Sequence, residues 1–141
     1  NSNQHAITPC QIGKMRSNLA RVGSRQRDLL VKTWCDLKLD RDLYIDSSYH
    51  LKGSRDVEGN IILLPGAQLR ISCRLSMPAG SEIVVHHGAE LILDGARIHN
   101  DCGKKWKGIR ILRKGKNMGL VYFGAIPIIE NTEKPLNFRV S

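Results

Sequence analysis

Aromatic residues are scarce in this chain, and it lacks long apolar runs, closely spaced cysteines and a leader peptide. Only 5% of its 141 residues are aromatic while 41% are hydrophobic, so a folded interior must consist mainly of Ile, Leu and Val. No run of about 18 apolar residues occurs, and no transmembrane segment is expected. The sequence begins at Asn1 as a processed or trimmed protein would, so no signal peptide indicates a location.

The cysteines form no CxxC pair, which argues against a structural zinc site. An even number of them permits disulfides in an oxidising compartment. Cys73 and Cys102 flank one copy of a repeated phrase described below, which suggests a Cys73–Cys102 bridge. The alternative is that both are small buried thiols.

Acidic residues are rare at both ends of the chain. The formal net charge is +9, and the surplus of Lys and Arg falls in residues 1–35 and 104–141, whereas residues 36–103 are mildly acidic. Such a separation of charge can attract an anionic partner, or it can be an ordinary solvated surface.

A phrase of strand, glycine corner and strand occurs twice. "IILLPGAQLRIS" begins at Ile61 and "IVVHHGAELILD" begins at Ile83, so the two copies are offset by 83 − 61 = 22 residues. Apolar and polar residues alternate within each copy, which is the period of a strand with one buried face. A looser copy continues through Gly124, with Ile126 and Ile128 extending the apolar pattern.

Repetition at about twenty residues, without a helix inside the unit, predicts a parallel β-helix whose coils bury their apolar faces against one another. Leu69 then stacks on Leu91, and Ala67 on Ala89. An antiparallel sandwich is the competing fold, but it gives no reason for a fixed register between two copies. We therefore expect an all-β fold, a right-handed single-stranded parallel β-helix of few coils.

Before the repeats, apolar residues from Ile12 to Leu30 lie near helical spacing, with a break at Gly23 and Ser24. An amphipathic helix there would cover the open strand edges of the first coil. The predicted organisation is a basic arm and capping helix over residues 1–35 and β-helix coils over residues 36–141. The alternative for the arm is a disordered segment.

The corner and core motifs carry a resemblance. The succession Gly59-Asn60-Ile61, Pro65-Gly66-Ala67, Gly88-Ala89 and Trp106-x-Gly108-Ile109 resembles right-handed β-helix segments of secreted bacterial cell-surface proteins with pectate-lyase-like architecture. It covers roughly residues 57–126. The resemblance implies an extracellular or cell-envelope location within a larger protein of more coils. It transfers no catalytic residue, because the matched positions are structural.

Catalysis on such a fold needs converging carboxylates. Glu82, Glu90, Asp94 and Asp101 show no convergent pair in the repeat register, so no catalytic residue, metal site or cofactor is predicted. His86 and His87 are adjacent on a strand and point in opposite directions, which favours a solvent-facing corner over a shared metal ion.

A basic stretch late in the chain is the main candidate binding site. Its residues are Lys104, Lys105, Lys107, Arg110, Arg113, Lys114 and Lys116. An anionic glycan or another protein surface can bind there; nucleic acid is disfavoured because only one aromatic residue, Trp106, lies within the stretch. A solvated basic face is the alternative.

The sequence therefore indicates a non-catalytic surface module for adhesion, glycan binding or structural spacing. Two alternatives remain: a degenerate or partial polysaccharide lyase or hydrolase, and a basic nucleic-acid-binding protein. The C-terminal coil is expected to be open, which permits self-association.

Overall fold

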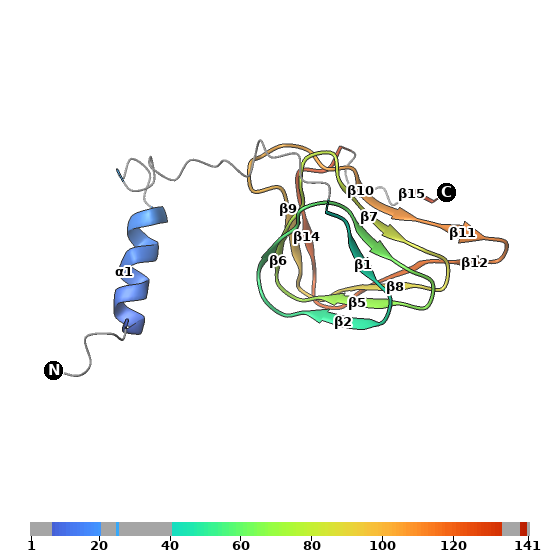
Figure 1. Cartoon of the computed structure of the whole chain (residues 1–141), viewed down its shortest axis with the longest axis horizontal. Coiled ribbons are helices and arrows are strands. Elements are labelled where there is room, and N and C mark those ends of the chain that lie inside the picture. The colour runs from blue at the N-terminus through green and yellow to red at the C-terminus, as the bar shows by residue number, and fades with distance from the viewer. Residues whose placement is uncertain (1–6, 21–24, 26–40, 134–138, 141) are drawn as a thin grey trace. The chain divides into compact units, whose positions relative to one another are not determined.

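The computed structural model of the chain describes residues 7–20, 25, 41–133 and 139–140 (Figure 1). The chain divides into two compact units, residues 1–34 and residues 35–141. The first unit contains one helix, α1 (Pro9–Ala20), and the second contains the strands. The predicted break at Gly23 and Ser24 and the predicted helical residues up to Leu30 lie outside the described residues.

Helix α1 begins at a capping box. Gln11 N donates to Thr8 Oγ1 at 3.2 Å, and Thr8 N donates to Gln11 Oε1 at 2.8 Å. These two bonds satisfy backbone amides at the helix start, and Pro9 at the first helical position has no amide to satisfy. The predicted N-terminal helix is present, and its packing on the first coil stays a prediction. No helix among the described residues is long and apolar enough to cross a membrane.

The second unit is built from short strands. They are β1 (Leu43–Ile45), β2 (Ser48–Leu51), β3 (Arg55–Asp56), β4 (Ile61–Leu63), β5 (Gln68–Ile71), β6 (Arg74–Ser76), β7 (Glu82–Val85), β8 (Glu90–Leu93), β9 (Arg97–His99), β10 (Gly108–Ile111), β11 (Arg113–Lys114), β12 (Asn117–Met118), β13 (Leu120–Phe123), β14 (Ile128–Ile129) and β15 (Arg139–Val140). We call β1–β3, β4–β6 and β7–β9 the first, second and third coils, and β10, β13 and β14 the fourth.

Three parallel sheets form the walls of a β-solenoid of about 3 turns. Their strand orders are β1-β4-β7-β10-β15, β2-β5-β8-β13 and β3-β6-β9-β14. Each strand pairs with its counterpart one coil away, and Figure 1 shows the coils winding around a common interior. This pairing confirms the parallel β-helix and excludes the antiparallel sandwich.

The repeat predicts the register correctly. Ile61 pairs with Ile83, and Leu69 pairs with Leu91. The Gln68 side chain donates to Glu90 Oε2 at 2.8 Å, between equivalent positions of two copies that are offset by 22 residues. One-residue slippage would turn the apolar side chains out to solvent, so the alternation fixes this register.

The core consists of stacked aliphatic side chains from all three sheets. Leu69 and Leu91 are fully buried, as are Ala67 and Ala89 at the corners. Trp106 is also fully buried, and its indole nitrogen donates to the carbonyl oxygen of Glu130 at 2.8 Å. Among the described residues, Trp106 is thus the one aromatic side chain in a core that is otherwise mainly aliphatic.

Polar side chains join successive coils at the start of the first sheet. Asn60 N donates to Asp42 Oδ1 at 2.8 Å, and Glu82 N donates to Asn60 Oδ1 at 2.9 Å. Each bond satisfies a backbone amide where the strand pairing begins. Asp42, Asn60 and Glu82 therefore form a column along the coil axis.

The fourth coil forms the edge of two sheets, because β13 and β14 have no second partner strand among the described residues. Leu120 and Tyr122 are exposed. The sequence pattern extended the apolar repeat to Ile126 and Ile128, but these side chains are 89% and 53% exposed. Ile128 pairs with the exposed Arg97 and therefore points outward, whereas the next residue, Ile129, pairs with the buried Ile98 and packs against the core.

Candidate functional site

The predicted basic stretch is divided by strand β10. Lys104, Lys105 and Lys107 precede β10, whereas Arg113, Lys114 and Lys116 follow its other end. Arg113 follows Lys107 by six positions, roughly 20 Å along an extended chain. The structure therefore presents two basic groups and not one continuous patch.

Arg110 stands between the two groups and is already paired. Its neighbours Ile109 and Ile111 are buried and point inward, so its own side chain faces outward. The guanidinium donates twice to Glu82 Oε1, at 2.7 Å from Nη2 and 3.1 Å from Nε. Arg110 thus joins the third and fourth coils, and its charge is offset by Glu82.

The second basic group lies on an inserted β-hairpin, residues 112–119, which we call the basic hairpin. Strands β11 and β12 pair antiparallel, with Arg113 opposite Met118 and Lys114 opposite Asn117. Gly115 has a φ of 63°, while Lys116 does not have a positive φ. Glycine at the first of two turn residues is typical of a type II′ turn, which matches the twist of two paired strands.

The basic hairpin is attached to the corner between β7 and β8. Gly88 N donates to Met118 O at 3.2 Å, and Leu112 N donates to Val85 O at 2.8 Å. His86 and His87 occupy this corner and are half-buried, with ring centroids 6.3 Å apart. The hairpin and the two histidines therefore belong to one surface.

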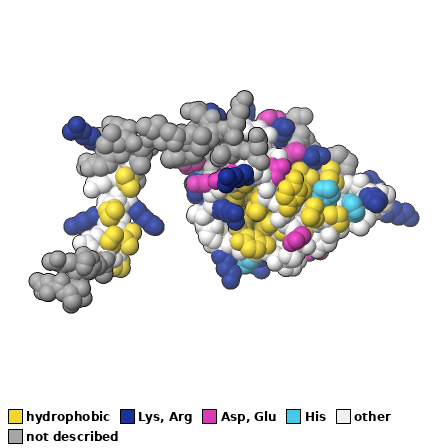
Figure 2. Space-filling model, viewed as in Figure 1, with side chains coloured by type: hydrophobic (Ala, Val, Ile, Leu, Met, Phe, Trp, Pro, Cys, Tyr) yellow, Lys and Arg dark blue, Asp and Glu magenta, His cyan; other side chains and the backbone are white. Residues whose placement is uncertain are grey.

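Positive side chains on the basic hairpin face solvent. Arg113, Lys114 and Lys116 are exposed, and no ion pair in the described part of the chain involves Lys114 or Lys116. Arg113 Nε donates to Gly115 O at 2.9 Å within the turn. Figure 2 shows His side chains beside Lys and Arg side chains at the right-hand end of the view, where Figure 1 places β11 and β12. This surface can bind an anion.

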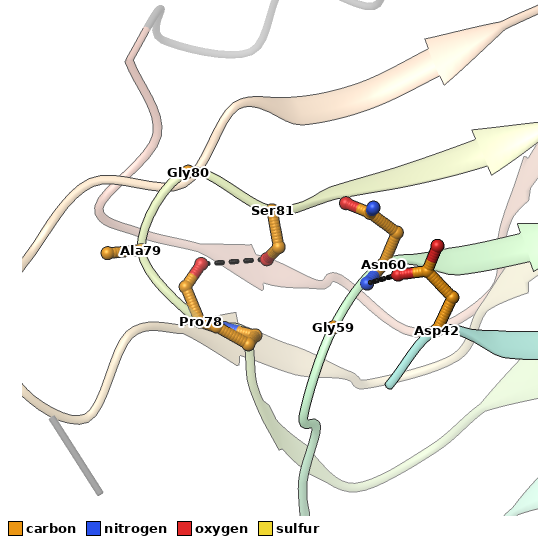
Figure 3. A pocket seen from close by; sticks show the side chains of 7 residues that line it. All are labelled: Asp42, Gly59, Asn60, Pro78, Ala79, Gly80 and Ser81. Atoms are coloured by element: carbon orange, nitrogen blue, oxygen red, sulfur yellow. Dashed lines mark hydrogen bonds between the residues drawn. The ribbon is translucent and has the colours of Figure 1, made fainter. Parts of the chain in front are cut away.

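The first basic group borders a turn of the preceding coil. Gly80 N donates to Lys105 O at 2.9 Å, and Lys107 N donates to Ser81 O at 2.8 Å. The turn formed by Pro78–Ser81 lines a pocket of about 270 Å³ together with Asp42, Gly59 and Asn60 (Figure 3). Lys105 and Lys107 are exposed beside it.

The acidic side chains considered for catalysis each have a polar partner. Asp94 accepts from Arg70, Glu90 from Gln68 and Glu82 from Arg110, and Asp101 lies 3.5 Å from Arg74. Arg70, followed by the backbone amide of Ala125, holds the pKa of Asp94 below its ordinary value. A general acid at neutral pH needs the opposite shift. The described residues contain no group of three or more His, Cys, Asp or Glu placed to hold a metal ion.

The predicted Cys73–Cys102 bridge is wrong. Cys73 is a free thiol, whereas Cys102 is disulfide-bonded. Cys73 precedes β6 and Cys102 follows β9, so the two residues lie at opposite ends of neighbouring strands, roughly 10 Å or more apart. A disulfide requires Cα atoms within about 7 Å.

Cys73 and His99 are two polar groups whose environments the sequence did not indicate. The Ser54 hydroxyl, 3.4 Å from the sulfur, and then the Arg74 amide lower the pKa of the Cys73 thiol. Burial, followed by the charges of Arg74 and Arg97, lowers the pKa of His99. His99 is 7% exposed, so it does not contribute to the surface.

Comparison of the chain with protein-family models, with curated proteins and with solved structures finds no match. A functional conclusion must therefore follow from the residues and their geometry. We base it on two features of the described residues: the basic hairpin with its histidine corner, and the polar pocket beside Lys105 and Lys107.

Proposed function

We propose that this chain is a non-catalytic β-helix module of an exported protein, and that the basic hairpin binds an anionic polysaccharide. The observation that carries this proposal is the insertion of Arg113, Lys114 and Lys116 on a hairpin outside the three sheets, where the described residues supply no acidic partner for the two lysines. The hairpin interrupts a regular repeat without contributing a strand to its walls. A surface function accounts for it better than stability does.

The fixed hairpin backbone favours binding. Pairing between β11 and β12 and the bond from Gly88 hold the positions of the three cations before a ligand arrives. Less backbone freedom is then lost on association than with a flexible basic tail. Residues 112–119 include no aromatic side chain on which a nucleobase can stack, which favours sulfated or carboxylated sugars over single-stranded nucleic acid.

The cysteines support an exported location. Cys102 is disulfide-bonded, and disulfides persist mainly in secreted and cell-envelope proteins. The resemblance to segments of secreted β-helix proteins points in the same direction. The short acid–cation contacts described above support a non-catalytic role.

Binding to dextran sulfate and to polygalacturonate, measured by calorimetry from about 50 to about 200 mM salt, tests the proposal. Lys114→Glu with Lys116→Glu is expected to weaken binding to both polymers by roughly tenfold, because each exposed cation contributes up to about 1 kcal/mol. The same change should flatten the salt dependence. Lys14→Glu with Lys52→Glu is the matched control, since it alters the net charge equally at exposed positions elsewhere.

Three outcomes would contradict the proposal. Unchanged binding by the hairpin variant would show that the hairpin is not part of the binding site. Stronger binding to DNA than to either polysaccharide at equal salt would favour the nucleic-acid alternative. Release of unsaturated or reducing sugars from polygalacturonate would overturn the non-catalytic assignment.

A further inference from the structure

The pocket beside the Pro78–Ser81 turn is made by two coils and the residues that precede β1. Pro78, Ala79, Gly80 and Ser81 form one side, and Asp42, Gly59 and Asn60 form the other (Figure 3). Ser81 N donates to Pro78 O at 3.2 Å, and Gly80 has a φ of 74°. Glycine at the third position of a four-residue turn is typical of a type II turn. A side chain at Gly80 would meet no atom within 4 Å, so the turn leaves open space there.

Three side chains bring spare hydrogen-bonding capacity to this pocket. Asp42 Oδ1 accepts from Asn60 N at 2.8 Å, Asn60 Oδ1 accepts from Glu82 N at 2.9 Å, and Ser81 Oγ donates to Pro78 O at 2.7 Å. Among the contacts of the described residues, the second carboxylate oxygen of Asp42, the amide hydrogens of Asn60 and the lone pairs of Ser81 remain for a ligand. The pocket therefore offers acceptors and donors together.

The donors and acceptors in the pocket favour some classes of ligand over others. A hydroxyl group both donates and accepts, so adjacent hydroxyls on a sugar ring match Asp42, Asn60 and Ser81. A small anion would meet the negative charge of Asp42. A metal ion would find one carboxylate, and the described residues hold no cluster of metal-ligating side chains. The pocket is thus best suited to a hydroxyl-rich ring.

Tyr44 provides an aromatic surface on the same side of the first sheet. It lies two residues after Asp42 on an extended strand, so both side chains point outward, about 7 Å apart along the chain. Its side chain is 60% exposed, while its neighbour Ile45 is buried. A flat, exposed aromatic ring can pack against the apolar face of a sugar.

We propose that Asp42, Asn60, Ser81 and Tyr44 bind one acidic sugar unit of the polysaccharide that contacts the basic hairpin. Its hydroxyls occupy the pocket, and its carboxylate lies toward Lys105 and Lys107, which border the turn one coil further on. This inference rests on the proposed function and assigns a role to the first basic group.

Short oligogalacturonates, titrated by calorimetry, test the pocket separately from the hairpin. Asn60→Asp keeps the Oδ1 acceptor for Glu82 N but removes the amide donors, and Tyr44→Ala removes the ring. Each change is expected to lower the affinity about 5- to 10-fold, the contribution of one hydrogen bond or one ring contact. Tyr122→Ala is the matched control, because Tyr122 is an exposed tyrosine on the fourth coil.

The outcomes distinguish this inference from the proposed function. Suppose that both pocket variants keep their affinity and have the same thermal midpoint as the unsubstituted protein. The proposal that the pocket binds the sugar is then wrong, while the proposal for the hairpin stands. Binding of dextran sulfate without any binding of oligogalacturonate would also rule out the pocket and leave the hairpin proposal standing. If the protein binds neither probe, both proposals are wrong.

Discussion

The second and third coils share one register, one corner and one set of buried side chains. The fourth coil keeps their register but carries an inserted hairpin, and one side of β13 and of β14 has no partner among the described strands. Leu69 and Leu91 are equivalent and fully buried. The strand that pairs next, β13, is separated from β10 by the basic hairpin and lies at the edge of its sheet. The comparison teaches that regular coils specify the fold, while departures from the repeat shape the surface.

Truncating a core side chain should give the largest difference in stability between the regular coils and the fourth coil. Leu91→Ala removes a fully buried side chain between Leu69 and Val121, and we expect it to lower the free energy of unfolding by about 2–5 kcal/mol. Val121→Ala in the fourth coil removes fewer atoms from a partly buried site and should cost less, under about 2 kcal/mol. Chemical denaturation measures both. Equal losses would show that the fourth coil is packed as tightly as the third.

The open edge should also make the fourth coil a site of self-association. β13 has an unpaired side among the described strands, and its Leu120 and Tyr122 are exposed. Sedimentation is expected to show concentration-dependent association, and Leu120→Lys with Tyr122→Lys should reduce it, because charged edge strands resist pairing. Ser17→Lys with Ser47→Lys adds the same charge at exposed positions and is the control. A monomer at every concentration would contradict the expectation.

A smaller, pH-dependent effect should report on the junction between the regular coils and the fourth. Asp94 accepts from Arg70 in the second coil and from Ala125 N, at 3.0 Å, in the fourth. Its lowered pKa means that the unfolded chain takes up a proton more readily. The Asp94 contribution to stability is therefore present above the ordinary Asp pKa and is lost as the pH falls through the lowered value.

Thermal denaturation across this acidic range measures that contribution. Asp94→Asn should lower the midpoint slightly at neutral pH and should flatten its decrease toward acidic pH. Asp46→Asn, at an exposed carboxylate, is the control. If the midpoint of Asp94→Asn varies with pH in parallel with that of the unsubstituted protein, Asp94 does not stabilise the junction.

Much of the fold could be predicted because each inward position repeats. Ile61, Ile83 and the alternating residues after Gly66 and Gly88 determine strand direction, register and burial together. The sequence alone did not predict the basic hairpin, because Lys104 to Lys116 form one continuous basic stretch in it. The Lys114-Gly115-Lys116-Asn117 turn was the available signal, since glycine at that position favours a two-residue hairpin loop.

The pocket could not be predicted, because its residues are distant in sequence and belong to different structural contexts. Asp42 and Asn60 both precede the first clear copy, Asn60 directly and Asp42 by a whole coil, and Ser81 ends a turn. Only the coil winding places them together. The Cys73–Cys102 prediction failed for a related reason: proximity to one repeat copy says nothing about which end of a strand a residue occupies.

The way the basic hairpin joins the solenoid has a practical consequence. Gly119 N donates to Leu112 O at 3.0 Å, so the two ends of the hairpin lie side by side. On either side of it, β10 keeps its register with β7, and β13 keeps its register with β8. We expect that residues 113–117 can be exchanged for a foreign peptide while Met118, which packs against the core, is kept. This corner is therefore a suitable graft position for displaying short sequences.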